Sequence, residues 1–190
     1  MRLTKTRLLG LAFRMTSPRY ADLHRTAEMS RVHLGRFNTG SVGAVYMSRE
    51  PDTAVEELRR RAARDGVSLG AMHPRAVFVV DLQLHEVVDL TKPGALDVWG
   101  LTREDLEAPD FARCQEVAAV AARLGAEAIR WPSSTGSGQS LAVFVESLQP
   151  GSRAEISRTF EITRAMLGAL QSGASVTTLI PELATIPLLP

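Results

Sequence analysis

Residues 35–61 read GRFNTGSVGAVYMSREPDTAVEELRRR, and this stretch predicts three successive elements of structure. A glycine-spaced loop leads into a short β-prone run at 42–47, which ends where Pro51 opens a segment with apolar residues at helical spacing. The order is therefore loop, strand and helix. Each of these three carries one side chain that suits ligand chemistry, namely Arg36, Tyr46 and Glu57.

The helix in this stretch is predicted to run over 51–64. Proline is favoured at the first helical position, Ser48 or Asp52 is expected to help the start, and Gly66 is placed to end the helix. The buried stripe is predicted as Ala54, Leu58 and Ala62. The solvent-facing side is predicted to consist of Arg59, Arg60, Arg61 and Arg64.

The segments on either side predict a sheet. Two β-branched runs, 75–82 and 86–90, are separated by only a few residues and predict an antiparallel hairpin. The other predicted elements are a short helix opened by a capping box at 102–105, a helix over 111–124 between Asp110 and Gly125, and strands over 127–131 and 141–146. This pattern favours an α+β fold of mostly antiparallel sheets with flanking helices.

Composition points to a site rather than to a charged surface. Of 190 residues, 45% are apolar, and 22 basic side chains face 21 acidic ones, which favours neither nucleic acid nor a membrane as partner. No stretch approaches the roughly 18 apolar residues of a membrane-spanning helix. The single Cys114 excludes an internal disulfide and a thiolate metal cluster, and the histidines lack metal-ligand spacing. We therefore expect a cytoplasmic protein without a metal.

The two ends of the chain are predicted differently. The N-terminus, MRLTKTRLLGLAF, begins like a signal peptide, but its apolar part is short and no cleavage site follows, so we place it in the fold. Beyond Pro150, RAEISRTFEI suits a strand, ISRTFEITRAMLGALQ also suits a helix, and prolines break the remainder. We predict a catalytic domain over 1–150 and an extension over 151–190 that packs on it.

The three side chains of the opening stretch also have plain structural interpretations. An arginine fork suits a phosphate, but the glycines around Arg36 also suit an ordinary hairpin loop. Tyr46 fits a half-buried strand position. Glu57, like its neighbour Glu56, fits the early turns of a helix, where the helix dipole favours acids. The residues taken singly leave these alternatives open.

In combination they resemble the RES-domain family, toxins of bacterial toxin–antitoxin pairs. The family has a glycine-arginine-aromatic-asparagine loop, a strand ending in tyrosine, a helix with glutamate, and a proline-serine loop before an apolar strand. The matching residues are Gly35-Arg36-Phe37-Asn38, Val45-Tyr46, Thr53-Ala54-Val55-Glu56-Glu57, and Trp131-Pro132-Ser133 before Leu141-Ala142-Val143-Phe144. The family spacing selects Glu57 over Glu56, and Gln115 lies where members often carry glutamine. Leu34 and Phe37 depart from the glycine and tryptophan usual in the family.

The resemblance implies an ADP-ribosyltransferase-like fold and cleavage of NAD⁺ at the bond between nicotinamide and ribose. Glu57 would stabilise positive charge developing on the ribose, and Tyr46 would stack on the nicotinamide. Arg36 would bind a phosphate or a ribose of NAD⁺.

Further contacts follow from the same resemblance. Ser133 would make a polar contact with the nicotinamide or the adjoining ribose, with Ser134 as the alternative. Arg14 and Arg19 resemble an N-terminal arginine stretch of the family and would add phosphate contacts.

Several alternatives stay open. Water, phosphate or a protein side chain could accept the ADP-ribose, which separates a glycohydrolase or phosphorylase from a protein ADP-ribosyltransferase. A non-catalytic module that only binds a nucleotide is the other class. The implied partner is a cognate antitoxin of the Xre type, to which any DNA contact would belong, and a homo-oligomer is compatible with the sequence.

Overall fold

The computed structural model describes residues 5–133 and 138–187, and its strands form one six-stranded sheet. The strands are β1 (Lys5–Thr16), β2 (Val45–Ser48), β3 (Arg75–Asp89), β4 (Ala128–Pro132), β5 (Gln139–Val143) and β6 (Arg153–Ile162). The predicted β-prone run therefore forms β2. The last predicted strand is shorter than expected, because a 3-10 turn, η3 (Val145–Ser147), follows it directly.

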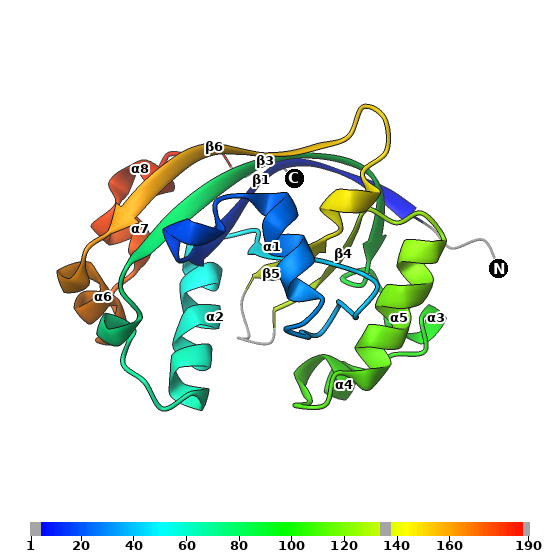
Figure 1. Cartoon of the computed structure of the whole chain (residues 1–190), viewed down its shortest axis with the longest axis horizontal. Helices are drawn as coiled ribbons and strands as arrows, with labels where there is room; N and C mark the ends of the chain where they lie inside the picture. The colour runs from blue at the N-terminus through cyan, green and yellow to red at the C-terminus, as the bar shows by residue number, and fades with distance from the viewer. Residues whose placement is uncertain (1–4, 134–137, 188–190) are drawn as a thin grey trace.

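The sheet closes on itself around β3. One edge of β3 pairs with β1, and the other edge pairs with β6 over its first part and with β4 at its end. The order β1-β2-β5-β4-β3, with β1 paired again to β3, joins five strands into a ring. In Figure 1 the long strands β1, β3 and β6 arch over β4 and β5.

The predicted α+β class with flanking helices is confirmed in this coarse form, whereas its sheet arrangement is corrected. Instead of several mostly antiparallel sheets, the chain forms one mixed sheet, in which β3 and β4 run parallel. The reason is the length of β3, which has 15 residues and can therefore accept different partners along one edge.

The predicted hairpin over 75–90 is wrong, because one continuous strand occupies this segment. The residues between its two β-branched runs, 83–85, include no glycine, proline or asparagine that would favour a turn. β1 pairs with β3 almost throughout, from Lys5 opposite Val88 to Thr16 opposite Ala76. Pairing with the long strand β1 thus keeps β3 continuous, although its apolar pattern is briefly interrupted.

The helices lie on both sides of the ring (Figure 1). They are α1 (Leu23–Ser30), α2 (Pro51–Arg64), α3 (Ala95–Val98), α4 (Arg103–Glu107), α5 (Ala112–Arg123), α6 (Arg164–Gln171), α7 (Val176–Leu179) and α8 (Pro181–Ala184), with 3-10 turns η1 (Pro18–Tyr20) and η2 (Leu69–Met72). The capping box at 102–105 is confirmed. None of the helices in the described ranges is long and apolar enough to cross a membrane.

The α2 helix has the predicted bounds and the predicted buried stripe. Gly66 follows its C-terminus with a φ of 66°, the left-handed conformation that glycine adopts without strain. Its start differs from the expectation, since neither Ser48 nor Asp52 caps it. The N-cap residue is Glu50, without a side-chain capping bond, and Asp52 instead accepts hydrogen bonds from the backbone and side chains of 175–177.

Three clusters of buried apolar side chains hold these layers together. The first lies between the strand layers and includes residues of α1. The second joins β1 and β3 to α2, α6, α7 and α8. The third joins β4 and β5 to α5 and to the loop before β2. Because the second cluster contains both α2 and the C-terminal helices, the segment after Pro150 is packed against the helix that carries Glu57.

Arg59 contradicts the predicted solvent-facing role of the α2 arginines. Its Nε donates to the carbonyl of Leu170 and its Nη2 to the carbonyl of Ala174, each at 2.8 Å, and it forms an ion pair with Glu56. These carbonyls belong to the end of α6 and the turn after it, where a cation is favoured. Arg59 therefore fastens the C-terminal segment to α2.

Replacing Arg59 with alanine is expected to lower the free energy of unfolding by about 2 kcal/mol, because two carbonyl groups lose a charged donor. Urea unfolding followed by tryptophan fluorescence measures this. Arg64→Ala is the matched control, since the Arg64 side chain is 68% exposed and pairs only with Asp65 in the described structure. Equal stability losses in both variants would refute the anchoring role of Arg59.

Candidate functional site

Glu57 is the centre of a polar cluster that joins α2 to two strands. The Oγ of Ser133 donates to Glu57 Oε1 at 2.9 Å, and the Oγ of Ser140 donates to the same oxygen at 3.4 Å. Ser133 follows the end of β4 and Ser140 lies in β5; both are buried, whereas Glu57 is partly exposed. The structure thus brings together two of the predicted site residues, Glu57 and Ser133.

The strand register brings this cluster to the sheet face that carries Tyr46. Tyr46 pairs with Ala142 of β5, and Ser140 lies two residues before Ala142, so Tyr46 and Ser140 project from the same face. Trp131 of β4 pairs with Ser140 and shares that face. Its ring centroid lies 6.2 Å from that of Tyr46, at an interplanar angle of 82°. An aromatic pair therefore stands next to the serines.

The hydroxyl group of Tyr46 is committed to the loop before β2. It accepts a hydrogen bond from the Phe37 N–H at 2.7 Å and donates to Asn38 Oδ1 at 2.8 Å. Burial raises the pKa of Tyr46 well above its usual value, and the Phe37 hydrogen bond and the charge of Arg36 offset only part of this rise. Tyr46 therefore presents its ring, and not an ionisable oxygen, to the site.

Arg36 points toward α4 and α5. Its Nη1 donates to the carbonyls of Asp105 at 2.8 Å and Ala108 at 3.3 Å, and its guanidinium carbon lies 4.6 Å from the centroid of the Phe111 ring. Among the described residues, no contact joins Arg36 directly to Glu57. Arg36 is linked to the Glu57 cluster only indirectly, because the loop that carries Arg36 is hydrogen-bonded to Tyr46 through the Phe37 N–H.

A second carboxylate, that of the α2 N-cap residue Glu50, fixes the base of the loop that joins β4 to β5. Glu50 Oε2 accepts from the N–H of Gln139 at 3.0 Å and from Thr53 Oγ1 at 3.3 Å, while the Ser133 N–H donates to the carbonyl of Gly138 at 3.0 Å. A Cβ on Gly138 would lie 2.2 Å from Thr53 Oγ1, and the φ of Gly138 is 77°. Only glycine fits, so the loop base that carries Ser133 is held closely against α2.

Arg14 and Arg19 lie together near η1. Arg14 donates to the carbonyl of Tyr20 at 2.9 Å, and burial lowers its pKa to about 10. Arg19 is exposed, donates to the Tyr20 hydroxyl at 2.7 Å and lies over the Tyr20 ring. Arg14 pairs with Phe78, which belongs to the cluster between the strand layers. Within the described residues, neither arginine contacts Glu57 or Ser133.

Of the two alternative site residues, Glu56 and Ser134, the structure describes only Glu56. Glu56 turns to Arg59 in an ion pair, so its carboxylate is engaged on another side of α2 than that of Glu57. Ser134, the alternative to Ser133, lies outside the described residues. Of the two glutamates, Glu57 contacts the serines and Glu56 contacts Arg59 in the described structure.

Sequence reasoning missed Ser140 and Glu50 as members of this cluster and Asn38 as a partner of Tyr46. The alternation in SLAVFV places Ser140 and Ala142 on one face of a strand. Which face meets α2 depends on strand pairing, which no local pattern gives. Asn38 belongs to the glycine-arginine-aromatic-asparagine motif, but its hydrogen bond to Tyr46 and its complete burial appear only in the structure.

No group of three His, Cys, Asp or Glu side chains in the described ranges is arranged to hold a metal ion.

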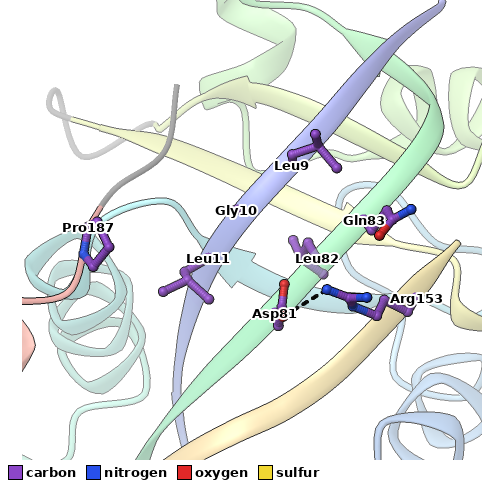
Figure 2. Close-up of a pocket in the computed structure, with 8 residues that line it drawn as sticks. All are labelled: Leu9, Gly10, Leu11, Asp81, Leu82, Gln83, Arg153 and Pro187. Atoms are coloured by element: carbon purple, nitrogen blue, oxygen red, sulfur yellow. Dashed lines mark hydrogen bonds and ion pairs between the residues drawn. The ribbon is translucent and has the colours of Figure 1, made fainter.

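A pocket on the outer face of β1, β3 and β6 is bounded by Pro187 and by the ion pair between Arg153 and Asp81 (Figure 2). None of the predicted site residues lines this pocket.

Comparison with known proteins adds relatives of stated activity. The chain is 26% identical over 163 residues to the NAD(+) phosphorylase MbcT of Mycobacterium bovis, covering 83% of this chain and 87% of that protein. The same values hold for MbcT of Mycobacterium tuberculosis. The crystal structure of the M. tuberculosis MbcT-MbcA toxin-antitoxin complex matches with a TM-score of 0.75 and 22% identity, covering 88% of this chain and 92% of the other, which shows a shared fold.

The family assignment rests on a longer match than the quoted motifs. The profile of the RES domain matches residues 11–165, from β1 into the start of α6. This range contains Arg36, Tyr46, Glu57 and Ser133, together with the strands that place them. The chain therefore belongs to the RES domain family.

Proposed function

We propose that this protein is a toxin that cleaves NAD⁺ between nicotinamide and ribose and transfers the ADP-ribose group to phosphate. One observation carries the proposal: the Glu57 carboxylate meets Ser133 and Ser140 on the sheet face of Tyr46. The likeness to the NAD(+) phosphorylase MbcT, over 83% of this chain, supports the choice of reaction.

Glu57 acts on the ribose next to nicotinamide. Bond cleavage passes through a state in which positive charge develops on the sugar, and a carboxylate placed beforehand stabilises it. Glu57 Oε1 receives both serine hydrogen bonds, so we assign Oε2 to the sugar and its hydroxyl groups. Ser133 and Ser140 then hold the carboxylate in one orientation, as productive geometry requires.

The reaction balances without a further reagent. The bond between the anomeric carbon and the ring nitrogen breaks, and both electrons go to that nitrogen, which leaves as neutral nicotinamide. A phosphate oxygen forms the new bond to the anomeric carbon, and the phosphate proton passes to solvent. The products are nicotinamide and ADP-ribose phosphorylated at the anomeric carbon.

The remaining side chains bind the dinucleotide. The Tyr46 ring, with Trp131 at its edge, offers a flat surface to the nicotinamide, where an aromatic face attracts a cation. Arg36 contacts a phosphate or ribose through guanidinium nitrogens other than Nη1, which the carbonyls of 105 and 108 occupy. Arg14 and Arg19 add further contacts to the phosphates.

We also propose a fold class, a domain division, a cellular location and a partner for this protein. The fold is ADP-ribosyltransferase-like, residues 1–150 form the NAD⁺-binding catalytic domain, and 151–190 form an extension packed on it. Arg59 supports the last point by joining α2 to the end of α6. The protein acts in the cytoplasm and is neutralised by a cognate antitoxin of the Xre type.

Incubating the purified protein with NAD⁺, with and without inorganic phosphate, tests the proposal. Nicotinamide is quantified by chromatography, and phosphorus NMR identifies the sugar product. We expect nicotinamide release that rises at least tenfold with phosphate and a new phosphorus signal from the phosphate bonded to the anomeric carbon. Free ADP-ribose at the same rate in both buffers would show a glycohydrolase instead, and ADP-ribose on protein would show a transferase. Bound NAD⁺ without nicotinamide release would leave only a binding module.

A further inference from the structure

The only proton of the Tyr46 hydroxyl group is used inside the protein. A phenol has one donor hydrogen, and Tyr46 gives it to Asn38 Oδ1 at 2.8 Å. The same oxygen accepts from the Phe37 N–H at 2.7 Å. A phenol engaged in this way has no proton to exchange with a substrate unless the loop before β2 opens.

Asn38 connects this hydroxyl to two further segments. The side chain is fully buried, its Oδ1 also accepts from the Gly35 N–H at 2.6 Å, and its Nδ2 donates to the carbonyl of Ser30 at 2.6 Å. One amide group therefore fixes the end of α1, the loop and β2 relative to one another. Removing it leaves the Tyr46 hydroxyl and the Gly35 N–H without this acceptor, which is costly for buried groups.

The packing around Gly35 leaves no space for a side chain at this position. A Cβ on Gly35 would lie 2.7 Å from the Tyr46 oxygen and 2.9 Å from Asn38 Oδ1, closer than a Cβ carbon approaches such atoms. The Gly35 carbonyl accepts from Gln115 Nε2 of α5 at 3.0 Å. Both polar groups of this glycine are thus held, one by the loop and one by α5.

These contacts bracket Arg36. The N–H before it belongs to Gly35 and the N–H after it belongs to Phe37, and both end on the pair formed by Asn38 and Tyr46. We infer that the Tyr46 hydroxyl and Asn38 are positioning groups that set the backbone of Arg36 and the tilt of the Tyr46 ring, and that the hydroxyl takes no part in proton transfer. This inference rests on the proposed function for its readout in activity.

The alternative, an acid–base role for the hydroxyl, predicts a different result for Tyr46→Phe. Loss of a general acid or base typically lowers kcat by about 100-fold or more and removes one limb of the pH profile. A positioning group acts on binding geometry, so we expect kcat/KM to fall about tenfold, mostly through KM, with the shape of the pH profile unchanged. Asn38→Ala is expected to give a similar loss, although it keeps the phenol.

A double-mutant cycle supplies the decisive comparison. Because the two groups act as one unit, Tyr46→Phe combined with Asn38→Ala should lower kcat/KM no more than the stronger single variant does. If the kcat/KM losses of the two single variants multiplied in the double variant, the inference would be overturned. It would also be overturned if one limb of the pH profile disappeared in Tyr46→Phe alone. Arg64→Ala, exposed at the end of α2, is the control expected to keep wild-type kinetics.

Urea unfolding of the wild-type protein, the two single variants and the double variant separates this inference from the proposed function. We expect the midpoint of the double variant to shift no further than that of the stronger single variant, even if the wild-type protein releases no nicotinamide from NAD⁺. Absent turnover would refute the proposed reaction while the unfolding cycle still tests the coupling. Additive midpoint shifts would refute the coupling, whatever the activity.

Discussion

Glu57→Gln is expected to lower nicotinamide release from NAD⁺ by about two to three orders of magnitude. The substitution keeps the size of the side chain and one oxygen for the serines, but it removes the negative charge to which we assign stabilisation of the developing cation on ribose. Single-turnover kinetics at saturating NAD⁺ measure this step. Far-UV circular dichroism should be unchanged, because Glu57 is partly exposed and its partners remain hydrogen-bonded.

Glu56→Gln provides the matched control for this prediction. It is the same substitution one residue earlier on the same helix, where the carboxylate pairs with Arg59 and its side chain is 39% exposed. We expect its turnover to stay within about twofold of the wild type, since a partly exposed ion pair contributes little. If Glu56→Gln lost activity and Glu57→Gln did not, the catalytic role would belong to the neighbouring acid.

The strongest effect on stability is expected at Glu127, a buried carboxylate in the turn before β4. Its Oε2 accepts from the N–H groups of His85 and Glu86 at 2.6 and 2.9 Å, and its Oε1 accepts from the Gln149 N–H at 2.7 Å. Glu127→Gln places an amide NH₂ against these donors and should lower the free energy of unfolding by about 3 kcal/mol. Urea unfolding at neutral pH measures the loss.

The pH dependence of stability follows from the same contacts. Burial by itself would raise the pKa of Glu127, but the hydrogen bonds to its charged form outweigh this and hold the pKa below its usual value. The contribution is therefore fully present above the unfolded pKa of about 4.3 and is lost as pH falls through the folded pKa. Glu127→Gln should have a flatter stability curve across this acidic range.

Glu116→Gln is the control for Glu127. The Glu116 side chain is 68% exposed in an ion pair with Arg113, so its removal should change the free energy of unfolding by less than about 0.5 kcal/mol and leave the acid limb intact. A Glu127→Gln protein as stable as this control at neutral pH, or with an unchanged acid limb, would refute the structural role of the buried carboxylate.

The sequence correctly predicted elements whose start and end depend on nearby residues, such as α2 and the capping box at Thr102. The α2 bounds follow from Pro51 at the start, apolar spacing within the helix and Gly66 after it, and the capping box at Thr102 follows from a short motif. The continuous β3 strand was missed because its course is set by pairing with β1, a partner distant in sequence. The parallel pairing of β3 and β4 depends on the same long-range order.

Some residues of the candidate site could be predicted from the sequence, whereas others appear only in the structure. Arg36, Tyr46, Glu57 and Ser133 were found because their types and spacing resemble a family pattern. Ser140 and Glu50 entered only with the structure, since strand register and the packing of a loop base decide which polar groups meet α2. Arg59 was misjudged because its partners lie more than 100 residues later, at the end of α6.

A crystal structure of the Glu57→Gln protein soaked with NAD⁺ tests whether the residues on α2, β2 and the β4–β5 connection form one dinucleotide site. We expect the ribose next to nicotinamide within hydrogen-bond distance of the side chain at position 57, and the nicotinamide ring against Tyr46. NAD⁺ bound instead in the pocket beside Pro187, or bound anywhere with the nicotinamide ribose away from position 57, would refute the account.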